Sequence, residues 1–143
     1  MTVRTILEEK GFEVQTIAPE ATLRAATELL AAKRIGAVVV TDSERHVVGI
    51  LSERDVVRVV GCDGPGRLDD SVASAMTKRV VTCDGNETVH RIMEQMTAGR
   101  FRHLPVVRGG KLVGIISIGD VVKHRLAEME RESHAMREYI MSA

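Results

Sequence analysis

Apolar and polar residues along the chain follow strand-like and helix-like periods, and these periods recur in the same order twice. The first unit is predicted to be strand 14–17, a helix with Leu23, Ala26 and Leu30 inward, strands 37–40 and 47–51, and a helix after Ser52. The second is predicted to be strand 80–83, a helix with Val89, Ile92, Met93 and Met96 inward, strands 104–107 and 112–116, and a helix after Ser117. A unit of roughly 45 to 50 residues is too small to cover both faces of a three-stranded sheet. We therefore expect the two units to share one core.

Three further segments lie outside these units. Val3, Ile6 and Leu7 share one face of a short helix that Gly11 should end, and this segment should pack on the body of the protein. The glycine-rich stretch 62–69 is the predicted linker, followed by a short helix over 69–76. The predicted organisation is an N-terminal segment (1–12), a first repeat (13–61), a linker with a short helix (62–76), a second repeat (77–127) and a C-terminal helical extension (128–143).

The last helix continues beyond the second unit with apolar residues spaced alternately by four and three. The stripe consists of Val122, Leu126, Met129, Met136 and Ile140, with Ser133 as a polar interruption. Such a helix either packs on its own domain and then frays, or forms a seam with a second chain. We favour the seam, because the unit is complete without the extension. The helices with the Val56-Val57 and Val121-Val122 pairs are expected to complete the homodimer interface.

The clearest repeat is a nine-residue block, GILSERDVV at 49–57 and GIISIGDVV at 114–122. In both copies an aspartate follows a serine by three positions, as in a capping box: Ser52 with Asp55, and Ser117 with Asp120. Free amides at a helix start also bind anions. The block is therefore explained by capping alone or by capping combined with phosphate binding.

Composition excludes several other classes of protein. The net charge is +0, from 20 basic and 20 acidic residues, and only 2% of residues are aromatic, so no nucleic acid partner is expected. No apolar run reaches the roughly 20 residues that span a bilayer, and no signal peptide is evident, so we expect a soluble cytoplasmic protein without a membrane partner. Cys62 and Cys83 lack metal-ligand spacing, and no metal site is expected. Nucleophile-elbow, Walker and dinucleotide-binding motifs are absent from the sequence, so no enzyme is predicted.

With IGAVVV at 35–40 and RHLPVV at 102–107, the two blocks resemble a tandem cystathionine β-synthase (CBS) domain pair of the small stand-alone bacterial type. The resemblance covers residues 10–126. It implies an α/β fold of two β-α-β-β-α repeats packed about a pseudo-twofold axis, here with an extended C-terminal helix, and two clefts between the repeats. It also implies an adenosine-containing ligand, with AMP preferred and NAD, ADP, ATP or S-adenosylmethionine as alternatives.

The resemblance assigns ribose binding to Asp55 and Asp120, and phosphate binding to Ser52 and Ser117. Arg102 and His103 are expected to hold phosphate in the second cleft, unless they form a solvated surface pair. Pro105 suggests an edge position at which main-chain groups of Leu104 meet the adenine. Arg54 either binds phosphate or pairs with Glu53 or Asp55. Thr16, Ile17 and Ala37 complete the candidate set.

In the first unit the positions equivalent to Arg102 and His103 are expected to be Ile35 and Gly36. The first cleft therefore lacks the Arg-His pair, and the two clefts should differ in affinity or ligand. The predicted function is a sensor of adenine nucleotides whose ligand alters the geometry of a homodimer, with an effector protein as a possible further partner. The alternatives are a structural or interaction protein with empty clefts and, less favoured, a nucleotide-processing enzyme.

Overall fold

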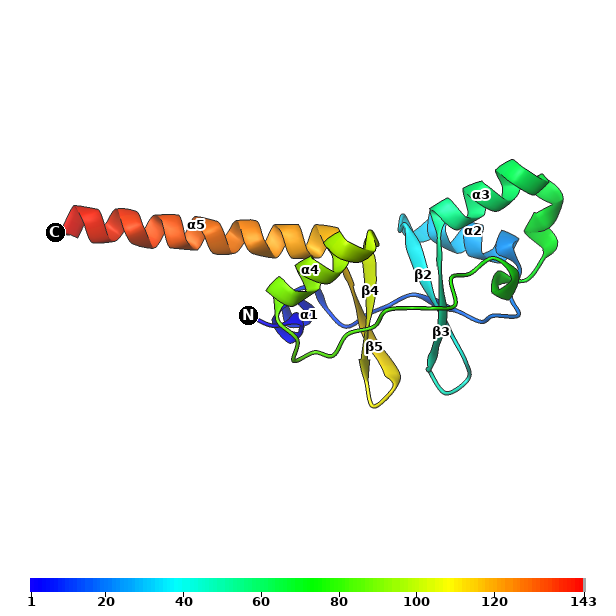
Figure 1. The fold of residues 1–143 in the computed structure, drawn as a ribbon, viewed down its shortest axis with the longest axis horizontal. Helices are drawn as coiled ribbons and strands as arrows, with labels where there is room; N and C mark the ends of the chain where they lie inside the picture. The colour runs from blue at the N-terminus through cyan, green and yellow to red at the C-terminus, as the bar shows by residue number, and fades with distance from the viewer. Residues whose placement is uncertain (143) are drawn as a thin grey trace.

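The computed structural model describes residues 1–142, which form two units with their sheets in the middle and helices outside (Figure 1). The elements are α1 (Val3–Lys10), β1 (Thr16–Ile17), α2 (Leu23–Lys33), β2 (Ala37–Thr41), β3 (Val47–Ser52), α3 (Glu53–Asp63), η1 (Pro65–Asp69), η2 (Val72–Ser74), α4 (Val89–Gly99), β4 (His103–Arg108), β5 (Lys111–Ser117) and α5 (Ile118–Ser142). This order confirms the predicted α/β fold of two related units with an extended C-terminal helix.

The sheet of the first unit has β2 at its centre. It pairs in parallel with β1 and antiparallel with β3, and every residue of β2 is buried. The Thr22 hydroxyl caps α2 by accepting a hydrogen bond from Ala25 N at 3.1 Å. In the second unit β4 and β5 pair antiparallel, with His103 opposite Ser117. Each hairpin leads directly into the helix that carries the repeated Ser-x-x-Asp block.

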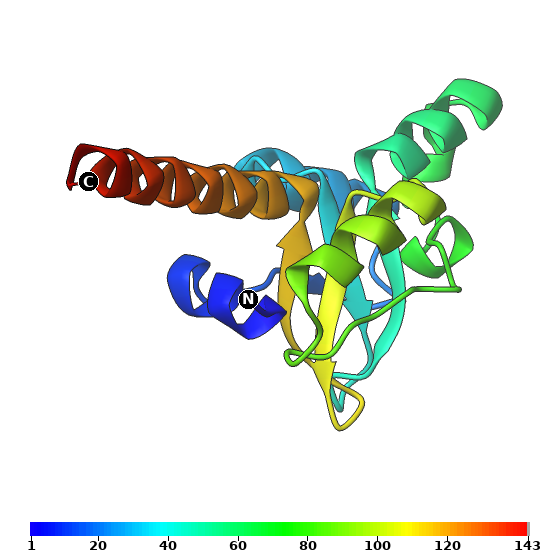
Figure 2. The ribbon, with the colours of Figure 1, turned by 60° about the vertical axis from the view of Figure 1, so that its left-hand side comes forward.

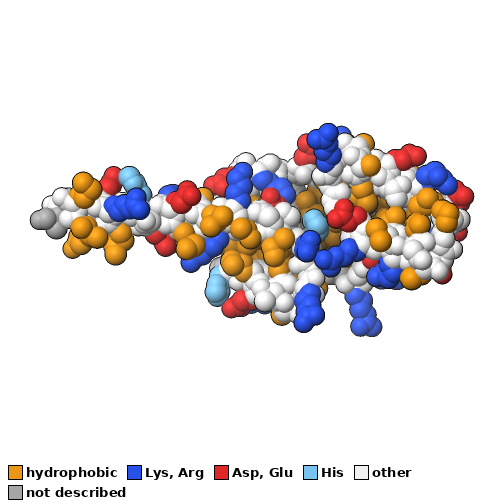
Figure 3. All heavy atoms as spheres, turned by 90° about the horizontal axis from the view of Figure 1, so that it is seen from above, with side chains coloured by type: hydrophobic (Ala, Val, Ile, Leu, Met, Phe, Trp, Pro, Cys, Tyr) orange, Lys and Arg blue, Asp and Glu red, His pale blue; other side chains and the backbone are white. Residues whose placement is uncertain are grey.

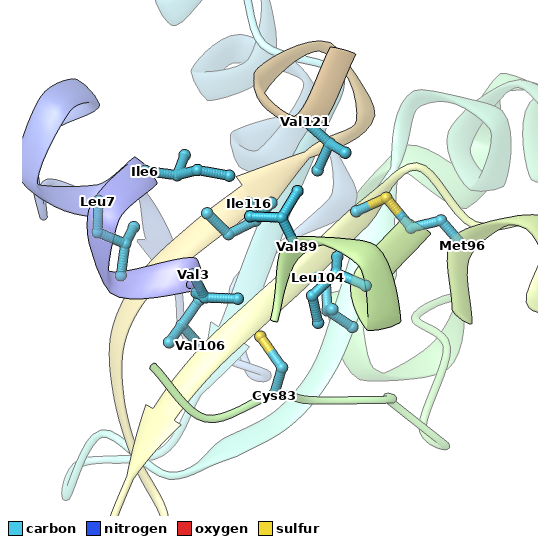
Figure 4. Packing of buried hydrophobic residues seen from close by; sticks show 11 residues of the cluster. Val3, Ile6, Leu7, Cys83, Val89, Met96, Leu104, Val106, Ile116 and Val121 are labelled. Carbon is cyan, nitrogen blue, oxygen red and sulfur yellow. The ribbon is translucent and has the colours of Figure 1, made fainter. Parts of the chain in front are cut away.

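The expectation of one shared core is wrong, because each unit has a hydrophobic cluster of its own. The first cluster joins residues of α2, β2, β3, α3 and η2, and the second joins residues of α1, α4, β4, β5 and α5 (Figure 4). Helices cover the outer face of each sheet (Figure 1). Val39 and Leu112 are buried but belong to neither cluster. Neighbouring Val38 and Val40 lie in the first cluster, so Val39 points to the opposite face of its sheet.

Helix α1 belongs to the core of the second unit. Its inward residues Val3, Ile6 and Leu7 are at most 4% exposed, which confirms the expected packing on the body of the protein. Leu7 lies against the backbone of β5, where a Cβ on Gly114 would stand 2.8 Å from Leu7 Cδ2. The helix therefore completes the second unit, although it precedes the first unit in the sequence.

Two predicted elements, the first strand of the second repeat and the short helix after the linker, take other forms. The strand expected at 80–83 is reduced to one bridge, in which Cys83 N donates to Pro105 O at 3.0 Å and Val107 N donates to Cys83 O at 2.9 Å. The helix expected over 69–76 is replaced by the short 3-10 segment η2, and η1 precedes it. Here Val72 N donates to Ala21 O at 2.7 Å. Main-chain pairing with the first unit therefore takes the place of helical hydrogen bonds.

Helix α5 has 25 residues and is about 37 Å long. Its outer part projects away from both units (Figures 1 and 2). Its buried residues are Val121 and His124, whereas the predicted stripe is exposed, from 47% at Val122 to 69% at Ile140. The expected aliphatic pair is thus divided, with Val121 in the core and Val122 outside. Among the described residues, no helix is long and apolar enough to cross a membrane.

Candidate functional site

A cleft with a volume of about 600 Å³ lies between the units, at the start of α3. Its walls come from the first turn of α3, the extended segment at 77–81 and the junction between α4 and β4. Ile50, Val80 and Val81 supply an apolar part. Residues 80–82 form no strand beside β4, and the side chains of Val80 and Val81 line this space.

The charged lining of the cleft is predominantly basic. It contains five arginines and a histidine against two carboxylates: Arg54, Arg58, Arg79, Arg100, Arg102 and His103, with Glu53 and Asp55. The whole chain has a net charge of +0, so this is a local concentration of positive charge. Figure 3 shows basic and acidic side chains gathered over the middle of the molecule. A concave basic surface with an apolar wall is suited to an anionic ligand that also has an apolar part.

Asp55 lies in the first turn of α3, in the predicted capping box. Its Oδ2 accepts hydrogen bonds from Ser52 N at 2.9 Å and Ser52 Oγ at 3.1 Å, and Ser52 Oγ accepts one from Asp55 N at 3.3 Å. The other oxygen, Oδ1, accepts from Arg58 Nη2 at 3.0 Å. The side chain of Asp55 is 9% exposed and that of Arg58 is 64% exposed. Displacement of the exposed arginine would therefore free Oδ1 for a ligand while Oδ2 keeps the cap.

Asp120 occupies the equivalent position at the start of α5 but has a different partner. Its Oδ2 accepts from Ser117 N at 2.8 Å and from Lys10 Nζ at 2.6 Å. Burial would raise the pKa of this carboxyl, but the hydrogen bonds from Lys10 and Ser117 outweigh it and hold the pKa below its ordinary value. The ribose acceptor that the resemblance places in the second cleft is thus ionised and paired with a lysine of the same chain.

Strand register corrects the expected correspondence of Arg102 and His103. Ala37 pairs with Ser52 in the first hairpin as His103 pairs with Ser117 in the second. Gly36 O accepts from Glu53 N at 2.9 Å, as Arg102 O accepts from Ile118 N at 2.8 Å. The counterparts of Arg102 and His103 are therefore Gly36 and Ala37, one position later than the apolar pattern indicated.

Arg102 and His103 also line a different cleft from the one expected. A Cβ on Gly36 would stand 3.6 Å from His103 Cε1 and 3.7 Å from Glu53 Oε1, so the imidazole lies close to the start of β2 in the first unit. Both residues line the cleft that contains Asp55. The reason is that the start of β2 and the start of β4 face each other between the two sheets. A long side chain at the start of one strand therefore reaches the other unit.

The ionisation of His103 is controlled by its central position. Burial lowers its pKa most, and the positive charge of Lys10 lowers it further, while the carboxylates of Asp120 and Glu53 act in the opposite direction. The net effect is a pKa below the ordinary value, so the imidazole is neutral at pH 7. An anion bound beside it would favour the protonated form.

The remaining predicted residues lie outside this cleft. Leu104 is fully buried in the core. Pro105 O accepts from Cys83 N, so the strand is not an open edge at this point. Because main-chain groups alternate in direction along a strand, those of Leu104 face β5, and the expected contact with an adenine edge is not available there. Thr16 and Ile17 form β1 beside Val39 and Val40, away from the lining of the cleft.

Three arginines of the cleft were missing from the sequence prediction. Arg58 follows Asp55 by three positions on a predicted helix, and this spacing was a usable signal. Arg79 and Arg100 lie outside the repeated blocks, on segments that meet only in the folded chain.

Comparison with known proteins gives a consistent match. A family model described as "CBS domain" matches residues 4–61 and 72–127. The crystal structure of the CBS-domain containing protein ATU1752 from Agrobacterium tumefaciens is 50% identical, with a TM-score of 0.84, and the alignment covers 87% of this chain and 99% of that one.

Two more distant proteins also match this chain. The CBS domain pair of protein MJ0100, solved in complex with methylthioadenosine and S-adenosyl-L-methionine, is 20% identical with a TM-score of 0.80, over 90% of this chain and 98% of that one. The CBS domain-containing protein CBSCBSPB5 from Arabidopsis thaliana is 30% identical over 90% of this chain. The alignment spans 23% of that relative, so the chain corresponds to about a quarter of its length.

Proposed function

The chain belongs to the CBS domain family, and from this membership together with the basic cleft we propose that it is a non-catalytic sensor of adenine nucleotides. The observation that carries the proposal is the composition of the cleft. It combines an apolar wall, a carboxylate at a helix start and a group of arginines in one space of about 600 Å³. These are the parts that bind a base, a ribose and a phosphate.

Each part of a nucleotide has a candidate partner in the cleft. Asp55 Oδ1 accepts hydrogen bonds from the ribose hydroxyls once Arg58 moves aside, and these bonds are strengthened by the charge of the carboxylate. Arg54 and Arg102 bind the phosphate with their forked donors. The base lies against Val80 and Val81 in the apolar part. Ser52 remains the helix cap and lines the cleft beside Asp55.

The charge of the cleft favours a phosphorylated ligand. Methylthioadenosine and S-adenosyl-L-methionine, the ligands of the MJ0100 domain pair, carry no phosphate. A cleft with five arginines and two carboxylates is poorly matched to a ligand without a phosphate. The mismatch is greatest for S-adenosyl-L-methionine, because its sulfonium group is a cation. We therefore place AMP first for this chain, followed by ADP, ATP and NAD.

Thermal melting with adenosine, AMP, ADP, ATP, NAD, NADH and S-adenosylmethionine tests this proposal. A ligand at about 100 times its Kd should stabilise the protein by roughly 2.7 kcal/mol, which raises Tm by several degrees at this chain length. Phosphorylated adenine ligands should give the largest shifts. A flat panel would refute nucleotide sensing, and turnover of any ligand would show that the protein is an enzyme.

The same proposal includes a homodimer in which α5 contacts a second copy. From Met129 to Ser142 every residue of α5 is exposed, and the apolar side chains of Met136 and Ile140 are 63% and 69% exposed. The exposed part of the helix, residues 129–142, is short enough to be only marginally stable in water without packing, which supports a partner for the stripe. A twofold axis would bring each stripe against its own copy. Val57 on α3, which is 70% exposed, would extend the contact nearer the cleft.

A further inference from the structure

The side chain of Lys10 pairs with Asp120, the carboxylate to which the resemblance assigns ribose binding in the second repeat. Its Nζ lies 2.6 Å from Asp120 Oδ2 and 2.9 Å from the carbonyl oxygen of Ile115. Lys10 and Asp120 are 30% and 23% exposed, so this ion pair is partly screened from water. Asp55, the counterpart of Asp120, is instead covered by an arginine from its own helix that is 64% exposed. The two equivalent carboxylates are thus paired differently, Asp120 with a lysine from α1 and Asp55 with an arginine from its own helix.

We propose that Lys10 is an internal competitor for the ribose acceptor of the second repeat, so that it determines which of the two sites binds adenosine-containing ligands first. The proposal rests on the nucleotide function proposed above. Lys10 already supplies the positive partner that Asp120 requires, and a ribose must displace it. The first site has no comparable obstacle, because its covering arginine is largely solvated.

The position of Lys10 follows from the way α1 is attached. Val3 N donates to Glu87 O at 3.0 Å and Arg4 N donates to Gly85 O at 2.9 Å, which binds the start of the helix to the second unit. Leu7 packs against Gly114 of β5. Lys10 is the last residue of the helix, and Gly11 follows with φ 104 and turns the chain away. The backbone of the helix is therefore fixed to the second unit, and Lys10 at its end reaches Asp120 through its side chain.

Displacement of Lys10 would act at the connection between the units. Helix α1 packs in the core of the second unit, while β1, six residues beyond Lys10 in the sequence, pairs with β2 of the first. His103 also senses the charges of both Lys10 and Asp120. Occupation of the second site would thus change the electrostatic surroundings of a residue that lines the first.

The test is a methyl NMR titration of the full chain with adenosine, which has no phosphate and so reports on the ribose and base alone. The Ile50 methyl reports on the first cleft, and the Ile118 methyl, next to Ser117, reports on the second. Lys10→Met removes the ammonium and keeps the length of the side chain. Lys33→Met is the matched control, because Lys33 is also the last residue of its helix and is exposed.

In the wild type the Ile50 response should saturate at a lower adenosine concentration than the Ile118 response. Lys10→Met should lower the Kd at Ile118 by roughly three- to tenfold, the value of a partly exposed charged hydrogen bond, whereas Lys33→Met should leave it unchanged. If Lys10→Met leaves the Kd at Ile118 unchanged or raises it while Ile50 still responds, Lys10 is not a competitor, and the proposed nucleotide function is unaffected.

The pKa of Asp120 in Lys10→Met separates the remaining outcomes. It should rise when the hydrogen bond from Lys10 is lost, and a constant pKa would show that the contact does not form in solution. If adenosine and AMP shift neither methyl in any variant, the nucleotide function is refuted. The competition with ribose is then refuted as well, even where the pKa of Asp120 rises.

Discussion

Replacement of Asp55 by asparagine separates its role in binding from its role in capping. Oδ2 is committed to Ser52 N at 2.9 Å, and the single carbonyl oxygen of asparagine can keep that hydrogen bond. The amide NH2 then stands where Oδ1 stood, next to Arg58 Nη2 at 3.0 Å, and two donors face each other there. The cap is retained in part, while the negative acceptor that faces the cleft is lost.

The two effects have different magnitudes. Partial loss of the cap and of the ion pair with the exposed Arg58 should cost up to about 1 kcal/mol, a fall in Tm of roughly 3 to 4 °C. Exchange of charge-assisted ribose contacts for neutral ones should weaken AMP binding by roughly 1.5 to 3 kcal/mol, or about ten- to hundredfold in Kd. Binding should thus be affected more than stability.

Isothermal titration calorimetry with AMP and a melting curve on the same sample measure both quantities. Asp42→Asn is the matched control, since Asp42 also accepts main-chain hydrogen bonds, from Glu44 N and His46 N at 2.9 Å each, in a hairpin turn that does not line the cleft. It should leave the Kd for AMP unchanged. If Asp55→Asn lowers Tm and leaves the Kd at the wild-type value, Asp55 is a helix cap and nothing more.

Four further predictions concern Arg102 and His103 in the cleft and the C-terminal helix. Arg102→Ala should weaken AMP by about tenfold and adenosine by much less, and equal losses in calorimetry would remove Arg102 from the phosphate. The pKa of His103 is lowered in the free protein and a phosphate would raise it, so AMP binding should take up a proton and strengthen as the pH falls from about 7.5 to 6. Comparison of the wild type with His103→Gln cancels the titration of AMP itself. Parallel pH profiles of the Kd in the two proteins would contradict a contact between His103 and the phosphate. In the free protein the same lowered pKa means that stability is lost as the pH falls below about 6.5, because the unfolded chain binds the proton first, and this loss should be smaller in His103→Gln. Deletion of residues 129–143 should weaken the dimer or convert it into a monomer, as measured by analytical ultracentrifugation, without changing the Kd for AMP. A wild-type protein that sediments as a 15.7 kDa particle at micromolar concentration would disprove the dimer.

The repeated block could be predicted because its information is local. The helix caps at Ser52 and Ser117 depend on residues three positions apart, and both form as the spacing indicates. The strands and helices of both hairpins depend in the same way on apolar period and turn residues. Expectations failed where main-chain groups found distant partners, as at Val72 and Ala21, which replaced the helix predicted over 69–76.

The amino-acid sequence by itself thus determined the two-unit fold, the capping boxes and the set of residue types suited to a nucleotide. Only the tertiary structure decided how those residues are grouped. It placed Arg102 and His103 beside Asp55 instead of Asp120, because the strand starts of the two units face each other between the sheets. It also paired Lys10 with Asp120, 110 positions away. Local spacing carries no record of such a contact, because the backbone between the two residues must fold before their charges can meet.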